Sequence, residues 1–274
     1  MSFRKFIAAA TVVVGMQMAG SSAQSISSQC QSTLASIVAN KDAACLNPSA
    51  LVSLAISNSD ASIVPTVNTW LSGLCSRAEC SNDTISEVVH SVASGCSSDL
   101  SSFGLSDVNG DELTSLVQMI YPTVREVVCL SDTNNNNTLC ITETLNNLEP
   151  YTGSLTASNI DKLVTGIVGG GSIPNLPSNV TCTDCTKAAY NILQKNFGDL
   201  VDGYSGSISS TCGASFIDGA SPATVSEVAD NQVQQSTTTA NAAAGSFAPI
   251  ALSPIFGVAA TTLLTAASAF FMLA

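Results

Sequence analysis

Apolar residues in the interior of this chain recur at intervals of three and four, the period of an amphipathic helix. The longest stripe runs from Leu113 to Val128. Shorter stripes with the same period lie at residues 30–38, 85–92 and 189–200. Alternating runs of β-branched and aromatic residues, which favour strands, are nearly absent. The pattern therefore predicts an all-α fold, either one fused helical bundle or two small bundles between Gln24 and Asp218.

Local signals predict where some helices begin and end. Thr84-Ile-Ser-Glu87 has the spacing of a capping box. Asn47-Pro48 places an N-cap residue before a proline at the first helical position. Glycines at 169–171 break any helix there. Trp70 falls on a helical segment, so we expect it in the core.

The first residues have the three-part layout of a secretory signal peptide. Arg4 and Lys5 precede an apolar run that ends near Met18, and small residues lead to Ala23. The run is shorter than the roughly 20 residues that span a bilayer. We expect a signal peptide at 1–23, cleaved after Ala23; the alternative is a buried N-terminal helix.

The last residues predict a glycosylphosphatidylinositol (GPI) attachment signal. Residues 255–274 carry no charge, and a cluster of small residues at 241–246 precedes them by a weakly polar spacer. Small residues, a spacer and an apolar tail make up such a signal. Asn241 fits the spacing best, with Gly245 and Ser246 as alternatives, and residues 247–274 would be removed. A retained tail-anchored helix is the competing interpretation.

Charge narrows the range of partners. Removing both ends leaves six Lys and Arg against twenty Asp and Glu, a net charge of −14. Because affinity for nucleic acid comes mainly from basic residues that neutralise phosphates, we exclude nucleic acid as a partner.

The cysteines predict a disulfide framework. An even number in a secreted chain favours disulfides, here up to five. Spacing alone leaves the pairing open, apart from a local bridge between Cys129 and Cys140. The ten are Cys30, Cys45, Cys75, Cys80, Cys96, Cys129, Cys140, Cys182, Cys185 and Cys212.

Cysteine order also suggests an internal duplication. A Cys-Leu pair is followed by three cysteines in each half of the interior, although the spacing differs by up to about 25 residues. We therefore predict two related helical halves, 24–100 and 101–218. Residues 219–246, rich in Ser, Thr and Ala, would form a disordered stalk that includes the attachment site.

Three sequons predict N-glycosylation in the secretory pathway, and with it a surface position. They begin at Asn82, Asn136 and Asn179.

Catalytic and metal-binding motifs are scarce. His90 is the only histidine, it lies off the apolar face, and we expect it to be solvated. Cys182-Thr-Asp-Cys185 has redox or zinc spacing without a second pair, so we expect two disulfide halves. The acidic run at 107–112 fails the EF-hand pattern at its sixth and twelfth positions and fits a turn before an acidic first helical turn. We predict no catalytic residues, metal or cofactor.

These features resemble a known group of proteins. The pairs Cys45-Leu46 and Cys129-Leu130 and the trios that begin at Cys75 and Cys182, between the predicted signal and tail, are similar to uncharacterised cysteine-rich, GPI-anchored surface proteins of filamentous fungi. The resemblance implies a fungal cell surface and supplies no activity. The clustered cysteines of the eight-cysteine haem-binding fungal domain are not matched, so haem is not expected.

Three functions remain open. The first is a structural or interaction protein on the outer leaflet of the plasma membrane, contacting cell-wall polymers or surface proteins. The second is a binding module for a fatty acid or sterol, which an apolar cavity would favour. The third is a hydrolase of wall polymers, which two facing carboxylates in a cleft would favour.

Overall fold

The computed structural model describes residues 27–52, 61–102, 110–156, 159 and 176–230. It is mostly helical and held by disulfides, which confirms the predicted fold class. The predicted signal peptide, residues 231–246 of the predicted stalk, the attachment candidates Asn241, Gly245 and Ser246, and the tail 247–274 lie outside the described residues. So do residues 107–109 and the glycines at 169–171.

The first part of the fold is a group of helices around α5. It contains α2 (Ser28–Ala39), α4 (Val64–Cys75), α5 (Asn82–Gly95) and α6 (Ser97–Ser102), with the short 3₁₀ turns η2 (Asp42–Leu46) and η3 (Pro48–Leu51). Ile85 and Val89 of α5 pack in one buried cluster with Cys45 and Cys80, and Leu113 of α7 covers it.

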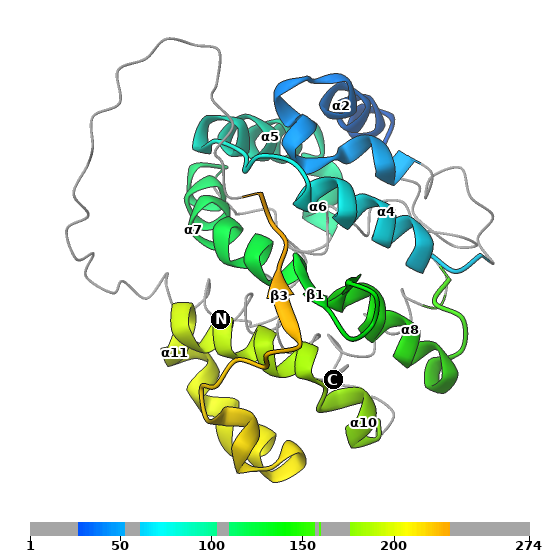
Figure 1. Cartoon of the computed structure of the whole chain (residues 1–274). Helices are drawn as coiled ribbons and strands as arrows, with labels where there is room; N and C mark the ends of the chain where they lie inside the picture. Colours follow the sequence, from blue (N-terminus) through cyan, green and yellow to red (C-terminus); the bar gives the residue numbers. More distant parts are fainter. Residues whose placement is uncertain (1–26, 53–60, 103–109, 157–158, 160–175, 231–274) are drawn as a thin grey trace.

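The central layer is α7 (Gly110–Val128), followed by β1 (Leu130–Asp132), β2 (Thr138–Leu139) and α8 (Cys140–Thr152). Helix α7 lies between α5 on one side and α11 on the other (Figure 1). The helix has two packed faces, because Val117 contacts the α5 cluster whereas Val127 belongs to the α11 cluster.

The last part contains α10 (Ser178–Thr181), α11 (Asp184–Cys212), η4 (Ala214–Ile217) and β3 (Val225–Glu227). Residues Ala188, Ala189, Leu193 and Val201 of α11 pack with Phe216 of η4 in a buried cluster. After η4 the chain turns back, and β3 crosses the front of the central layer (Figure 1).

Strand β3 corrects two expectations. It forms a small antiparallel sheet in the order β2-β1-β3, with Ser131 opposite both Leu139 and Ser226. Strands of two or three residues are too short to show alternation, so no sequence pattern predicts them. The ordered chain also continues past Asp218, where we expected the stalk to begin: residues 219–230 are part of the fold.

The helix starts are partly as predicted. Helix α5 begins three residues before the predicted capping box, because Ser81 is extended and its Oγ accepts from the amide of Thr84. Glu87 accepts instead from Asn40. Pro48 does occupy the first position of η3, but that turn is 3₁₀ and Asn47 makes no side-chain cap.

Asn47 instead forms hydrogen bonds with the main chain of α4. It is buried with φ of 49°, and its amide donates to the carbonyl oxygens of Thr69 and Trp70. Trp70 is partly buried against a cluster formed by Ile63, Val67, Leu71 and Leu139. Its indole donates to Leu46 O at 2.9 Å.

All ten cysteines are paired, in five bridges. The pairs are Cys30–Cys96, Cys45–Cys80, Cys75–Cys129, Cys140–Cys185 and Cys182–Cys212. The Cys75–Cys129 bridge joins the two predicted halves, whose bounds stay a prediction.

The expected Cys129–Cys140 bridge is wrong. Cys129 lies just before β1 and pairs with Cys75, whereas Cys140 is the first residue of α8 and pairs with Cys185. The two cysteines accordingly belong to different clusters, Cys129 with Leu74 and Cys140 with α11.

Candidate functional site

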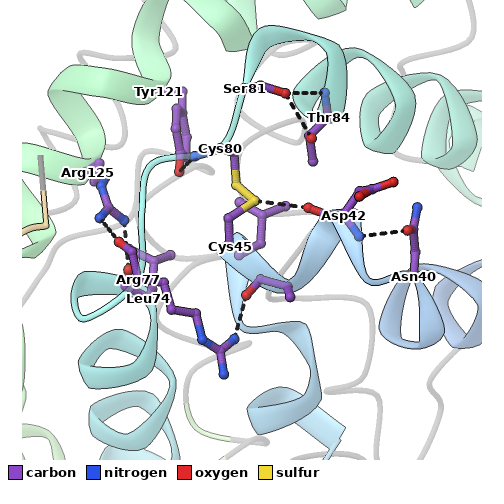
Figure 2. The surroundings of a disulfide bond; sticks show 12 residues. Asn40, Asp42, Cys45, Leu74, Arg77, Cys80, Ser81, Thr84, Tyr121 and Arg125 are labelled. Atoms are coloured by element: carbon purple, nitrogen blue, oxygen red, sulfur yellow. Dashed lines mark hydrogen bonds between the residues drawn. A yellow bond between two sulfur atoms is a disulfide. The ribbon is translucent and has the colours of Figure 1, made fainter. Parts of the chain in front are cut away.

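Polar side chains around the Cys45–Cys80 bridge form a hydrogen-bonded network (Figure 2). Three segments meet there: η2, the end of α4, and α7. Tyr121 on α7 accepts from the amide of Cys80 at 3.2 Å. Burial raises the pKa of Tyr121, and this amide and the nearby Arg125 oppose the rise. The phenol therefore stays neutral and acts as a hydrogen-bond acceptor for the bridge.

Arg125 is the central group of this network. Only 4% of its surface is exposed, yet it carries a full charge. Its guanidinium donates to Leu74 O at 2.7 Å and to the carbonyl of Arg77. Figure 2 shows both contacts. A helix C-terminus leaves its last carbonyls without partners inside the helix, and a cation beside them is favourable. Arg125 therefore caps the end of α4.

The same guanidinium fixes the last described residue. Arg125 Nη2 donates to Asp230 O at 3.1 Å, while the amide of Asp230 donates to Cys75 O at 2.9 Å. Just upstream, Val228 N donates to Cys129 O. Asp230 is thus tied beside the Cys75–Cys129 bridge. We call residues 213–230 the C-terminal strap, because they lead from the end of α11 across β1 to this point.

One carboxylate of the strap is in an unfavourable place. Burial raises the pKa of Glu227, and repulsion from Glu126 on α7 raises it further, while Arg125 opposes the rise. Ionised Glu227 therefore weakens the seating of the strap at neutral pH.

Sequence reasoning did not find Arg125 or the strap. Arg125 is a polar position inside the stripe that ends at Val128, and such a position is usually solvent-facing. In the structure Arg125 is buried, whereas Val124 is exposed. The one sequence signal of this is the position of Arg125 within the apolar stripe, between Val124 and Val127.

The other candidate residues are placed as follows. His90 is half-exposed, as expected, with its Nε2 3.4 Å from Asp111. Asp111 lies with Glu112 in the first turn of α7, also as expected. Within the described ranges, no group of three or more His, Cys, Asp or Glu could hold a metal ion. Cys182 and Cys185 are halves of two different bridges, as predicted.

The three sequon asparagines are all exposed. Asn82 begins α5, Asn136 lies in the loop between β1 and β2, and Asn179 lies in α10. Each position is open to an attached glycan, and its occupancy stays a prediction.

Among the residues that the structure describes, no helix is long and apolar enough to cross a membrane. Searches found no matching protein family, no matching curated protein and no matching solved structure.

Proposed function

We propose that the chain is a GPI-anchored extracellular surface protein with a structural or interaction role. Five disulfides in one helical fold fit an extracellular or secreted protein. The observation that supports the proposal is the strap: Asp230, the last described residue, is tied by main-chain and guanidinium hydrogen bonds beside a buried disulfide. Such an end can bear a tether without disturbing the rest of the fold.

The number of residues between Asp230 and the attachment site limits how far the fold can stand from the membrane. From Asp230 to Asn241 there are 11 residues, which span at most about 40 Å at 3.6 Å per residue. A tether that began at Asp218 would have twice as many residues. The folded part would therefore stand close to the outer leaflet, in reach of polymers and proteins in the layer next to the membrane.

The acidic surface favours partners without strong negative charge. In the described part of the chain, Arg125 is buried, Arg77 donates to Ala44 O and Lys187 is paired with Asp218 at 2.8 Å. Three of the five Lys and Arg side chains among the described residues thus have partners within the fold, and carboxylates outnumber the remaining basic groups. A neutral polysaccharide or a basic protein segment fits this surface better than another polyanion.

Detergent partition tests the anchor. The full chain is expressed in a fungal host, its membranes are extracted, and the extract is treated with phosphatidylinositol-specific phospholipase C. We expect the chain to move from the detergent phase to the aqueous phase on treatment. A chain that stays in the detergent phase and keeps residues 247–274 would be a tail-anchored protein. A chain that is aqueous before treatment would have no lipid anchor.

A further inference from the structure

Helix α11 is bent back on itself, and one disulfide closes the bend. Its 29 residues would extend about 43 Å as a straight helix. Phe197, however, has non-helical angles of −140° and 42°, and the Cα atoms of Cys182 and Cys212 are 5.3 Å apart. The helix is therefore two arms, 184–196 and 198–212, whose far ends the Cys182–Cys212 bridge holds together.

This bridge differs from the other four in exposure. The remaining eight cysteines are buried, each with 4% or less of its surface exposed. Cys182 and Cys212 are only partly buried, at the margin of the α11 cluster. Because exchange requires that a thiolate reach a sulfur, this is the bridge that a reductant in solution meets first.

The surroundings of its two sulfurs are also unequal. The Thr181 hydroxyl lies 3.3 Å from Cys182 Sγ and 3.5 Å from Pro177 O, so its one proton is shared between the sulfur and this carbonyl. Cys182 is the C-cap of the four-residue α10 and directly precedes Thr183, the N-cap of the much longer α11, whose N-terminus favours a thiolate. Cys212 is the last residue of the second arm, where the helix dipole disfavours one. Cys182 is therefore the better leaving group.

Apart from this bridge, a few side chains hold the second arm. Val201 is buried and Ile208 partly buried in the α11 cluster, and Gln194 donates to Asp202 across the bend. By contrast, a Cβ added at Gly203 or Gly206 would meet no atom within 4 Å. Glycines inside a helix lower its stability, which makes the arm prone to open once its end is free.

We propose that Cys182–Cys212 is an exchangeable disulfide, through which a dithiol releases the second arm of α11. The attacking thiolate bonds to Cys212 Sγ, the Sγ–Sγ bond breaks, and Cys182 leaves as a thiolate that takes a proton from water. The second thiol of the reductant then displaces Cys212. The dithiol is oxidised to a disulfide, and the protein gains two electrons and two protons. Release uncovers the apolar face of Leu193, Val201 and Phe216. This inference does not rest on the proposed anchor.

Stepwise reduction of the native full chain tests it. The protein is titrated with dithiothreitol, quenched with iodoacetamide and mapped by mass spectrometry. We expect Cys182 and Cys212 to be alkylated at reductant concentrations at least about tenfold below those that open any other pair. Amide exchange in residues 198–212 should rise in step. Simultaneous opening of all five bridges, or earlier opening of another, overturns the proposal.

Two variants test whether the Cys182–Cys212 bridge holds the second arm or is merely exposed. Cys182→Ser/Cys212→Ser should show raised exchange in residues 198–212 without reductant. Exchange equal to that of the parent would mean that the bridge does not hold the arm. Thr181→Val keeps the shape and removes the hydroxyl, so reduction should slow several-fold. With excess glutathione the mixed disulfide should form on Cys212, and adducts found on Cys182 would contradict the assigned direction of attack.

Discussion

Arg125 and Asp230 are 105 residues apart in sequence, and the guanidinium of the first binds the main-chain oxygen of the second at 3.1 Å. This contact joins the last turn of α7 to the last described residue. It holds the strap in place beyond Asp218, where the composition turns stalk-like.

Replacing Arg125 by Met should destabilise the fold strongly. The methionine fills a similar path but leaves the carbonyls of Leu74, Arg77 and Asp230 without the donor they have now. Each unpaired buried acceptor costs up to about 3 kcal/mol. We expect the free energy of unfolding to fall by about 2–4 kcal/mol in total. Urea unfolding followed by circular dichroism measures it. Lys195→Met, at an exposed site, is the control and should change little. Equal stability of the two variants would contradict the role of Arg125.

Two glycine-to-alanine changes should have opposite signs. A Cβ at Gly73 would lie 2.1 Å from the amide nitrogen of Asn47, which is held by two carbonyls and cannot move away freely. Gly73→Ala should therefore cost about 1–3 kcal/mol. Gly203→Ala meets no neighbour and should stabilise by up to about 1 kcal/mol. Thermal unfolding of both variants measures the two changes in stability. A stabilised Gly73→Ala would show that Asn47 is not fixed as described.

Much of the helical fold follows from the sequence, because the apolar stripes at 30–38, 85–92 and 113–128 fall within α2, α5 and α7. The strap does not follow. The three residues of β3 gain their conformation from a register with β1, about ninety residues earlier. The disulfide pairing is also set by the fold: Cys129 and Cys140 are close in sequence, but they pack in different clusters and pair with Cys75 and Cys185. Arg125 is recognisable only once the carbonyls around it are in place.

Glu227 should make stability depend on pH. Its pKa in the fold is raised above the ordinary value of 4.5. Protonated Glu227 thus favours the fold; this contribution is complete below pH 4.5 and is lost as the pH rises through the raised value. Glu227→Gln removes the charge, so it should be more stable than the parent at pH 7. The gain should shrink below pH 4.5. Chemical unfolding at both pH values measures it, with the exposed Glu112→Gln as control. A gain that is the same at both pH values would show that the charge of Glu227, through its partial burial and its repulsion from Glu126, is not the cause.

The exposed sequons should carry glycan when the chain is made in the secretory pathway. Asn82→Gln, Asn136→Gln and Asn179→Gln should each remove one step of the mass that peptide-N-glycosidase F releases. Because all three side chains are exposed, unfolding temperatures should change little. A variant with unchanged mass would identify a sequon that is not used.

The anchor is tested most directly at the C-terminus of the mature chain. Protein from a fungal host is reduced, denatured and cleaved after glutamate, which frees the segment that follows Glu227. The account predicts a terminal peptide of residues 228–241 with the ethanolamine phosphate remnant of a glycolipid on Asn241, or a peptide that ends at Gly245 or Ser246 with the remnant on that residue. A terminal peptide that ends at Ala274 without a lipid remnant would contradict it.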